Sequence, residues 1–225
     1  MNHTKIACMP VDIPEMFQSE LLVNFITEQE YQIGKVLVED KYIEWSRKEV
    51  CLFYTDVQKE ISTNWKESVN QPTSLSNDIK KETQRLIDFL HQHLPIDLTF
   101  LSIIKSKGEL PAHFDVTENN LTSEAIQSQP EPSLLKILLR PQYSINKLYF
   151  TNKDGTEKTM FGLSNYANDT NLYAWSRRTQ MHGVHDSTND TDRIIINIYG
   201  NFDKDRYKNL VDKSYQKYKN KVILF

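Results

Sequence analysis

Apolar residues recur at helical spacing between about residues 76 and 94, in "SNDIKKETQRLIDFLHQHL". The apolar positions are Ile79, Leu86, Phe89 and Leu90. Spaced in this way, they lie along one side of a helix with 3.6 residues per turn. Ser76 or Asn77 can cap the first turn, and Pro95 follows directly after the last one. The pattern therefore predicts a helix over 76–94.

After Pro95 the pattern changes to short β-branched and aromatic runs separated by turn residues. The runs cover 98–106, 133–141, 146–151, 156–163, 171–176 and 193–200. Asp154-Gly155 within "NKDGT" predicts a hairpin turn between two of them. A long polar loop, 117–132, separates the first run from the second, and loops of that length are usually functional or mobile. This pattern predicts an antiparallel sandwich or barrel.

Two further stretches flank these runs. The tail 204–222 predicts a polar surface helix with Leu210 and Val211 turned inward. The first 75 residues mix a possible helix in "EMFQSELLVNFI" with strand-like pieces over 31–55. We therefore expect a mainly β fold with flanking helices, as a single domain over 1–225. In it, an N-terminal layer of helix and strand (1–97) packs on a β core (98–200).

Composition limits the classes of function. The chain of 225 residues has a net charge of −3 with acids and bases interspersed, so no basic stripe favours nucleic-acid binding. Cys8 and Cys51 form no CxxC spacing, which argues against a disulfide framework or a structural zinc site. The N-terminus lacks the features of a secretory signal, and no window approaches about 20 apolar residues. These features predict a soluble, cytoplasmic protein without membrane contact, and none of them fixes an oligomeric state.

Candidate chemistry begins at "PAHFDV", residues 111–116. His113 and Asp115, at i and i+2, project to the same side of an extended strand and can converge on one metal ion. A third ligand must come from elsewhere, and the remaining histidines are His3, His91, His93, His182 and His185. His91 and His93 suit a helix C-terminus, where positive charge is favourable, and His3 lies at the chain end. That leaves His182 or His185.

Two histidines and one carboxylate leave about half of an octahedral coordination sphere open, which suits non-haem Fe(II) that also binds a co-substrate and oxygen. His113-x-Asp115, followed after 69 residues by His182 and after 11 more by Arg193, resembles the HxD…H…R pattern of the 2-oxoglutarate-dependent Fe(II) oxygenases. His182 precedes Gly183-Val184 as in the family's H-x-V, whereas His185 lies only 8 residues before Arg193. We therefore prefer His182 as the distal ligand.

The resemblance covers roughly residues 98–200. "GELPAHFD", "NLYAWSRRTQMHGV" and "DRIIINIYG" are similar to the segments that carry the HxD pair, the distal histidine and the basic residue. It implies a double-stranded β-helix, a jelly-roll barrel of cupin-like shape. It also implies that Fe(II) is bound by His113, Asp115 and His182, with 2-oxoglutarate and O₂ as co-substrates. Lys105 departs from the family, which often has an aromatic residue there.

By the same resemblance, Arg193 binds the distal carboxylate of 2-oxoglutarate, a task that suits the planar guanidinium fork. The alternative is that Arg193 is merely an exposed strand start beside Asp190 and Asp192. Strand alternation places Asn197 and Tyr199 on the same face as Arg193, so both are expected to line the co-substrate pocket. In "LLKILLR", alternation groups Lys136, Leu138 and Arg140 on one face, which either holds a carboxylate or faces solvent.

The implied reaction is hydroxylation of a substrate C–H bond. Because Asp115 is present, halogenation is disfavoured, since halogenating members of the family replace this carboxylate with a small residue. The loop 117–132 and the pair Arg177 and Arg178 suggest a lid and an anion clamp. These features favour a small carboxylate-bearing substrate such as a free amino acid. A peptidyl side chain is the second choice, and a non-catalytic cupin-like binding protein is the alternative from another class.

Overall fold

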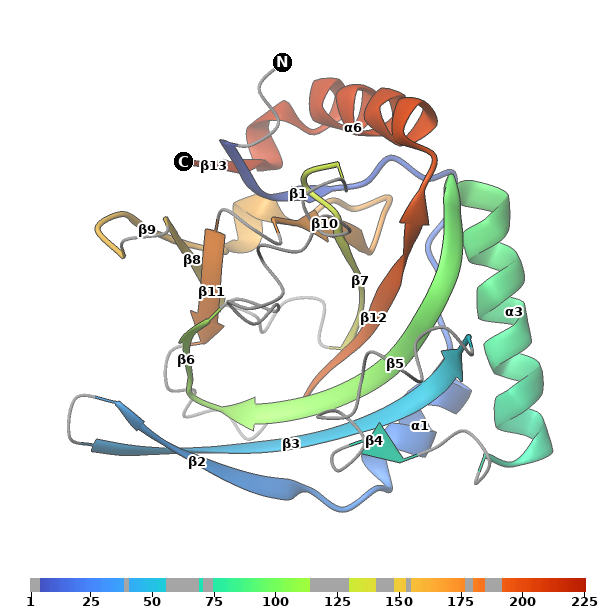
Figure 1. Ribbon diagram of the computed structural model, residues 1–225, viewed down its shortest axis with the longest axis vertical. Helices are drawn as coiled ribbons and strands as arrows, with labels where there is room; N and C mark the ends of the chain where they lie inside the picture. Colours follow the sequence, from blue (N-terminus) through green and yellow to red (C-terminus); the bar gives the residue numbers. More distant parts are fainter. Residues whose placement is uncertain are drawn as a thin grey trace.

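The computed structural model describes residues 5–38, 41–55, 69–70, 75–113, 130–140, 148–152, 155–176, 180–184 and 192–225. In these residues the fold is mainly antiparallel β-sheet with three α-helices (Figure 1). Within them, no helix has the length and apolar character needed to cross a membrane. The mainly β class with flanking helices, predicted from the sequence, is therefore confirmed.

The larger of the two sheets has nine strands in the described part of the chain. Their order is β13 (Ile223–Leu224), β1 (Ile6–Pro10), β10 (Leu172–Trp175), β7 (Leu134–Arg140), β12 (Arg193–Phe202), β5 (Ile96–Gly108), β3 (Lys41–Tyr54) and β2 (Gln32–Val38), with β4 (Val69–Asn70) beside β3. The N-terminal strands β2 and β3 extend this sheet beyond β5, and β1 pairs with the last strand, β13. Strands from the N-terminal and C-terminal parts of the chain, β1 and β13, therefore lie side by side at one edge of the sheet (Figure 1).

The smaller sheet has the order β6 (Leu110–His113), β11 (Gln180–Val184), β8 (Leu148–Asn152) and β9 (Lys158–Met160). Strands β5 to β8 pair with strands β9 to β12 in reverse order. The pairs are β5 with β12, β6 with β11, β7 with β10 and β8 with β9, all antiparallel. Successive pairs are joined sideways, since β7 also pairs with β12 and β8 also pairs with β11.

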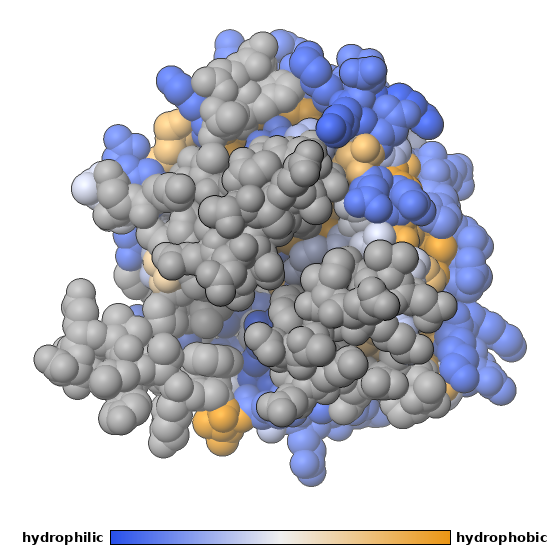
Figure 2. Space-filling model, viewed as in Figure 1, coloured by the Kyte–Doolittle hydropathy of each residue, from blue (hydrophilic) through white to orange (hydrophobic). Residues whose placement is uncertain are grey.

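The helices cover the larger sheet from outside. They are α1 (Glu20–Thr27), α3 (Asn77–His93) and α6 (Lys204–Lys217), with short 3-10 turns η3 (Leu163–Asn165) and η4 (Lys219–Lys221). Helix α3 begins where predicted, because the Ser76 hydroxyl accepts a hydrogen bond from the Ile79 N–H at 3.3 Å. It ends before Pro95, which disfavours helical geometry in the residue before it. In Figure 2 the outer surface over α3 and α6 is mostly hydrophilic.

Two apolar cores lie on opposite faces of the larger sheet. Ile194, Ile196 and Ile198 of β12 join the core beneath α1 and α3, whereas Ile195 and Tyr199 pack against the core between the two sheets. Side chains of a strand alternate between faces, so one strand serves both cores. The alternation predicted for β12 is confirmed.

The prediction for "LLKILLR" was partly wrong. Lys136 and Leu138 face the interior, but the Arg140 guanidinium donates to the Glu20 carboxylate on α1 at 2.6 Å, outside the sheet. The pairing of β12 with β7 shifts register next to this point, between Ile194 and Ile195. An irregularity of this kind changes which face the following residues occupy.

The register of β12 against β5 shifts between Tyr199 and Gly200, and this shift requires glycine. A Cβ atom at Gly200 would lie 2.3 Å from the Asp97 carbonyl oxygen and 2.7 Å from Cγ1 of Ile96. Both neighbours belong to the paired strand β5, so the backbone must move to admit a methyl group.

We therefore expect Gly200→Ala to lower the free energy of unfolding by about 1–3 kcal/mol, measured by urea denaturation. Gly162→Ala is the matched control, because a Cβ there meets no atom closer than 3.9 Å. An unchanged urea midpoint for Gly200→Ala would show that the close approach is absent in solution.

Candidate functional site

The candidate site is built around His182 on the smaller sheet. On β11 its Cα partners are His113 of β6 on one side and Phe150 of β8 on the other. Its side chain is 5% exposed and meets the Trp175 ring of the larger sheet edge to face, with centroids 4.8 Å apart. The Phe150 ring lies 6.2 Å away. The imidazole therefore points into the space between the sheets.

Backbone pairing brings position 113 directly opposite position 182. Opposite positions of an antiparallel pair share one face, with Cβ atoms about 4.5–5.5 Å apart. This separation allows two residues to bind one ion. The structure thus joins two of the three predicted metal ligands at the level of the strand register, although 69 residues separate them in the sequence.

Several predicted residues lie outside the described part of the chain. They are Asp115, His3, His185, Arg177, Arg178, Asp154, Asp190 and residues 117–129 of the polar loop. In the residues that are described, no group of three or more His, Cys, Asp and Glu side chains is arranged to hold a metal ion. A metal site that uses His182 therefore needs a ligand from beyond those residues, and the sequence names Asp115.

Arg193 occupies the start of β12 and faces the interior. Its side chain is buried, with 9% exposed, so the alternative of an exposed strand start is wrong. Nη2 donates to the Gly108 carbonyl at 3.1 Å, and among the described residues this is its hydrogen-bond partner. Burial lowers its pKa, but the guanidinium stays charged at neutral pH. Within the described residues, the other four N–H donors of the guanidinium have no hydrogen-bond partner and could meet an anion.

The residue before Arg193 is held by an element far away in the sequence. The hydroxyl of Tyr31, just before β2, donates to the Asp192 carboxylate. Burial, and then the nearby Asp192 charge, raise the pKa of Tyr31, so the phenol stays protonated. This contact fixes the backbone from which Arg193 enters the interior.

Asn197 lies on the same face of β12, four residues after Arg193. Its side chain is 3% exposed, and its Oδ1 has no hydrogen-bond partner in the described part of the chain. Tyr199, two residues further, is half-buried and meets the Phe100 ring edge to face at 5.7 Å. Of the two predicted pocket residues, Asn197 thus offers an unused polar atom, while the Tyr199 ring packs against an aromatic neighbour.

Lys105 and Lys136 lie on opposite faces of the larger sheet. Lys105 faces outward, where its ammonium donates to the carbonyls of Thr27 (2.9 Å) and Gln29 at the end of α1. Lys136 faces inward, is 3% exposed, and places Nζ 4.2 Å from the centre of the Trp175 ring. Lys105, where the family often has an aromatic residue, thus binds carbonyls at the end of α1. Lys136 is the lysine that faces the interior among the described residues of β5 and β7.

A further charged group on the interior face was missed by sequence reasoning. Glu49 of β3 is buried, and its carboxylate accepts hydrogen bonds from Ser102 Oγ and Arg47 Nη2, each at 2.6 Å. It lies outside the segment that resembles the oxygenases. The available signal was a glutamate in the strand-like stretch "RKEVCLFYT", which alternation alone did not assign to a face.

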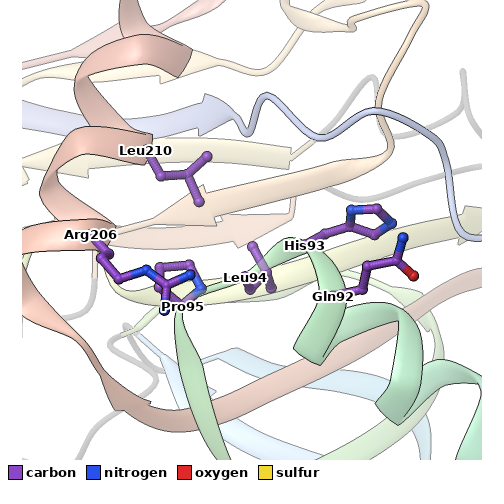
Figure 3. A pocket seen from close by; sticks show the side chains of 6 residues that line it. All are labelled: Gln92, His93, Leu94, Pro95, Arg206 and Leu210. Atoms are coloured by element: carbon purple, nitrogen blue, oxygen red, sulfur yellow. The ribbon is translucent and has the colours of Figure 1, made fainter.

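His93 belongs to a separate surface feature. Its Nε2 lies 3.3 Å from the Glu15 carboxylate, and its ring lines a pocket of about 140 Å³ between the end of α3 and α6 (Figure 3). Pro95 and Arg206 also line this pocket. Because β5 begins at this end and pairs with Arg193 at the other, the pocket lies far from the candidate site.

The comparisons with known proteins identify no family for this chain. No family model matches the sequence, and no curated protein matches it. Among solved structures, a crystal structure of an oxidoreductase of the 2OG-Fe(II) oxygenase family from Burkholderia pseudomallei is similar, with a TM-score of 0.39 and 9% identity. The match covers 82% of this chain and 80% of that chain. A likeness this weak carries no argument, so function must be inferred from the residues themselves.

The two cysteines are buried thiols on strands of the larger sheet. Burial raises the pKa of Cys51 to about 12, and its Sγ lies 3.5 Å from the Phe53 carbonyl. Burial also raises the pKa of Cys8 well above its usual range, against the opposing influence of Lys136. Thiols in such surroundings react slowly, because the thiolate is the nucleophile.

We expect neither cysteine of the folded protein to be alkylated by iodoacetamide at pH 8 within an hour, as measured by mass spectrometry. With a pKa of about 12, only about one thiol in ten thousand is ionised at that pH. In urea both sites should react, because unfolding restores an ordinary pKa near 8.5. Rapid labelling of Cys51 without denaturant would contradict its burial.

Proposed function

We propose that the protein is an Fe(II)- and 2-oxoglutarate-dependent oxygenase that hydroxylates a C–H bond of a small carboxylate-bearing substrate. The observation that carries the proposal is the register of β11, which sets His182 opposite the histidine of the HxD motif, His113. Sequence spacing alone cannot produce this pairing, because β6 and β11 are brought together by the fold. Arg193, buried on the facing sheet, supplies the cation that the motif requires.

The strand pairing supports a double-stranded β-helix. The segment β5–β8 pairs with β9–β12 in reverse order, as in one long hairpin. The side-by-side pairs β7 with β12 and β8 with β11 wind that hairpin into successive turns. A jelly roll, in which the strands divide between two facing sheets, would have strand pairs of this kind. In the proposal, residues 1–225 form one domain with its catalytic core over 98–200.

The donor set fits Fe(II). Two imidazoles and one carboxylate from His113, His182 and Asp115 would hold the metal and leave positions open for 2-oxoglutarate and oxygen. His182 is preferred to His185 as the distal ligand, because its strand position faces His113. The aromatic rings of Trp175 and Phe150 pack around His182 and restrict its orientation.

The residues also fit 2-oxoglutarate. When bound, the iron and its co-substrate supply the oxidising power for C–H hydroxylation. The chain's own contribution is to bind, orient and exclude water. Arg193 would hold the distal carboxylate through the N–H groups not used by Gly108. Trp175 and Phe150 belong to the apolar cluster between the sheets and would keep water from the metal side.

The proposed partner is a small molecule in the cytoplasm. The net charge of −3, with mixed signs along the chain, does not favour a nucleic acid. The interior face of the larger sheet carries the cations Arg193 and Lys136, which favour a ligand with carboxylate groups over an apolar one.

The proposal is tested by adding Fe(II) and 2-oxoglutarate to the protein without oxygen. We expect the weak visible charge-transfer band of the chelate, and we expect His182→Ala to lose it, with Fe(II) bound more than about 100-fold more weakly. His93→Ala is the matched control, because His93 lies at the end of α3, far from the site. If folded wild-type protein gives no band, the proposed enzymatic function is refuted and the non-catalytic binding protein is favoured.

The role of Arg193 has its own test in the same assay. Replacing it with methionine should raise the dissociation constant for 2-oxoglutarate by about 30-fold or more, since one partner of a buried charge pair is removed. Arg206→Met on α6 is the control, because that guanidinium is exposed. If Arg193→Met binds 2-oxoglutarate like the wild type, another residue holds the distal carboxylate.

A further inference from the structure

The interior face of the larger sheet holds a second cation, well separated from Arg193. Lys136 of β7 is 3% exposed, and its Cα partner on β12 is Asn197. Asn197 lies four residues after Arg193, which corresponds to about 13 Å along a strand. The backbone positions of Lys136 and Arg193 are therefore well separated along the sheet, which leaves room for two separate anion sites.

Two buried polar atoms beside Lys136 lack hydrogen-bond partners among the described residues. One is Oδ1 of Asn197, an acceptor, and the other is Nε1 of Trp175, a donor. Buried groups of this kind are normally hydrogen-bonded, and each one left unsatisfied costs free energy. Trp175 pairs with Leu134, two residues before Lys136 on the same face of β7, so the three side chains are neighbours.

The same tryptophan connects Lys136 to the proposed metal histidine. The Lys136 ammonium lies 4.2 Å from the centre of the Trp175 ring, and the His182 ring lies 4.8 Å from Trp175. The Lys136 ammonium therefore lies no more than about 9 Å from the centre of the His182 ring. A small molecule anchored at Lys136 can extend over this separation and hold a C–H bond beside the metal side of the interior.

From these contacts we propose that Lys136, Trp175 and Asn197 form the substrate site, and that it takes a free α-amino acid. The Lys136 ammonium and the Trp175 N–H bind the carboxylate, while Asn197 Oδ1 accepts a hydrogen bond from the substrate ammonium. An α-amino acid carries its ammonium and carboxylate on one carbon, so both groups reach adjacent side chains of the sheet. The inference rests on the proposed function and names the substrate class of that site.

The test measures binding of each of the twenty L-α-amino acids by isothermal titration calorimetry. Titrations are made with metal-free protein and, without oxygen, with protein that holds Fe(II) and 2-oxoglutarate. We expect at least one amino acid to bind and its carboxamide, which lacks the negative charge, to bind much more weakly. Absence of binding by all twenty acids in both states would overturn the inference.

Lys136→Met keeps the apolar stem beside Trp175 and removes the charge. It should weaken binding of the amino acid by about 30-fold or more and leave binding of the carboxamide within a factor of about three. Trp175→Phe removes the N–H donor and keeps an aromatic, though smaller, ring beside Lys136 and His182, and it should weaken binding of the acid by about tenfold. It also carries the test if Lys136→Met fails to fold. Lys158→Met is the matched control, a lysine 3.8 Å from the centre of the Tyr149 ring on the exposed strand β9.

The second source of a carboxylate is 2-oxoglutarate itself. If Lys136→Met weakens 2-oxoglutarate and spares the amino acid, the site belongs to the co-substrate and the inference is overturned. Failure of the proposed function looks different, because the charge-transfer band is then missing while Lys136-dependent amino-acid binding to metal-free protein persists. A normal band with amino-acid binding that ignores Lys136→Met refutes the substrate site alone.

Discussion

The ladder that pairs β12 with β5 and β7 is the contact on which the rest of the structure depends. It runs through the middle of the larger sheet, so each side chain of β12 must face either the helices or the interior. The isoleucines at 194, 196 and 198 are buried in the core beneath α1 and α3. Their packing fixes the strand against rotation and leaves Arg193 and Asn197 no direction but inward.

This arrangement makes the interior unusual for a protein core. Buried lysine, arginine, glutamate and asparagine side chains share one face with aromatic residues, although such groups are rarely buried unless they are paired. Glu49 is paired, because it has both Ser102 and Arg47. Asn197 Oδ1 and Trp175 Nε1 have no partner in the described residues. Polar groups with protein partners, such as Glu49, support the fold, whereas those without such partners are suited to binding a ligand.

Local pattern was sufficient wherever a local rule decides the structure. The helix that starts after Ser76 follows from spacing, and alternation correctly divides the side chains of β12 between the two faces of the sheet. The local pattern could not predict which segments, distant in the sequence, pair with one another. Glu49 meets Ser102 across 53 residues only because β3 has one register against β5, and Arg140 turns outward because β7 shifts register against β12. The short strand β11, "QMHGV", lacks the β-branched run that marks a strand, so its pairing with β6 required the fold.

Trp175 shows how the ends of the chain take part in the site. Its ring separates the proposed metal histidine from Lys136, so its position sets the distance between them. Its strand, β10, is held on one side by β7 and on the other by β1, where Cys8 is the Cα partner of Trp175. Strand β1 is in turn paired with the terminal strand β13. Loss of that terminal pairing would free the edge that carries Trp175, and the geometry of the interior would loosen before the central ladder did.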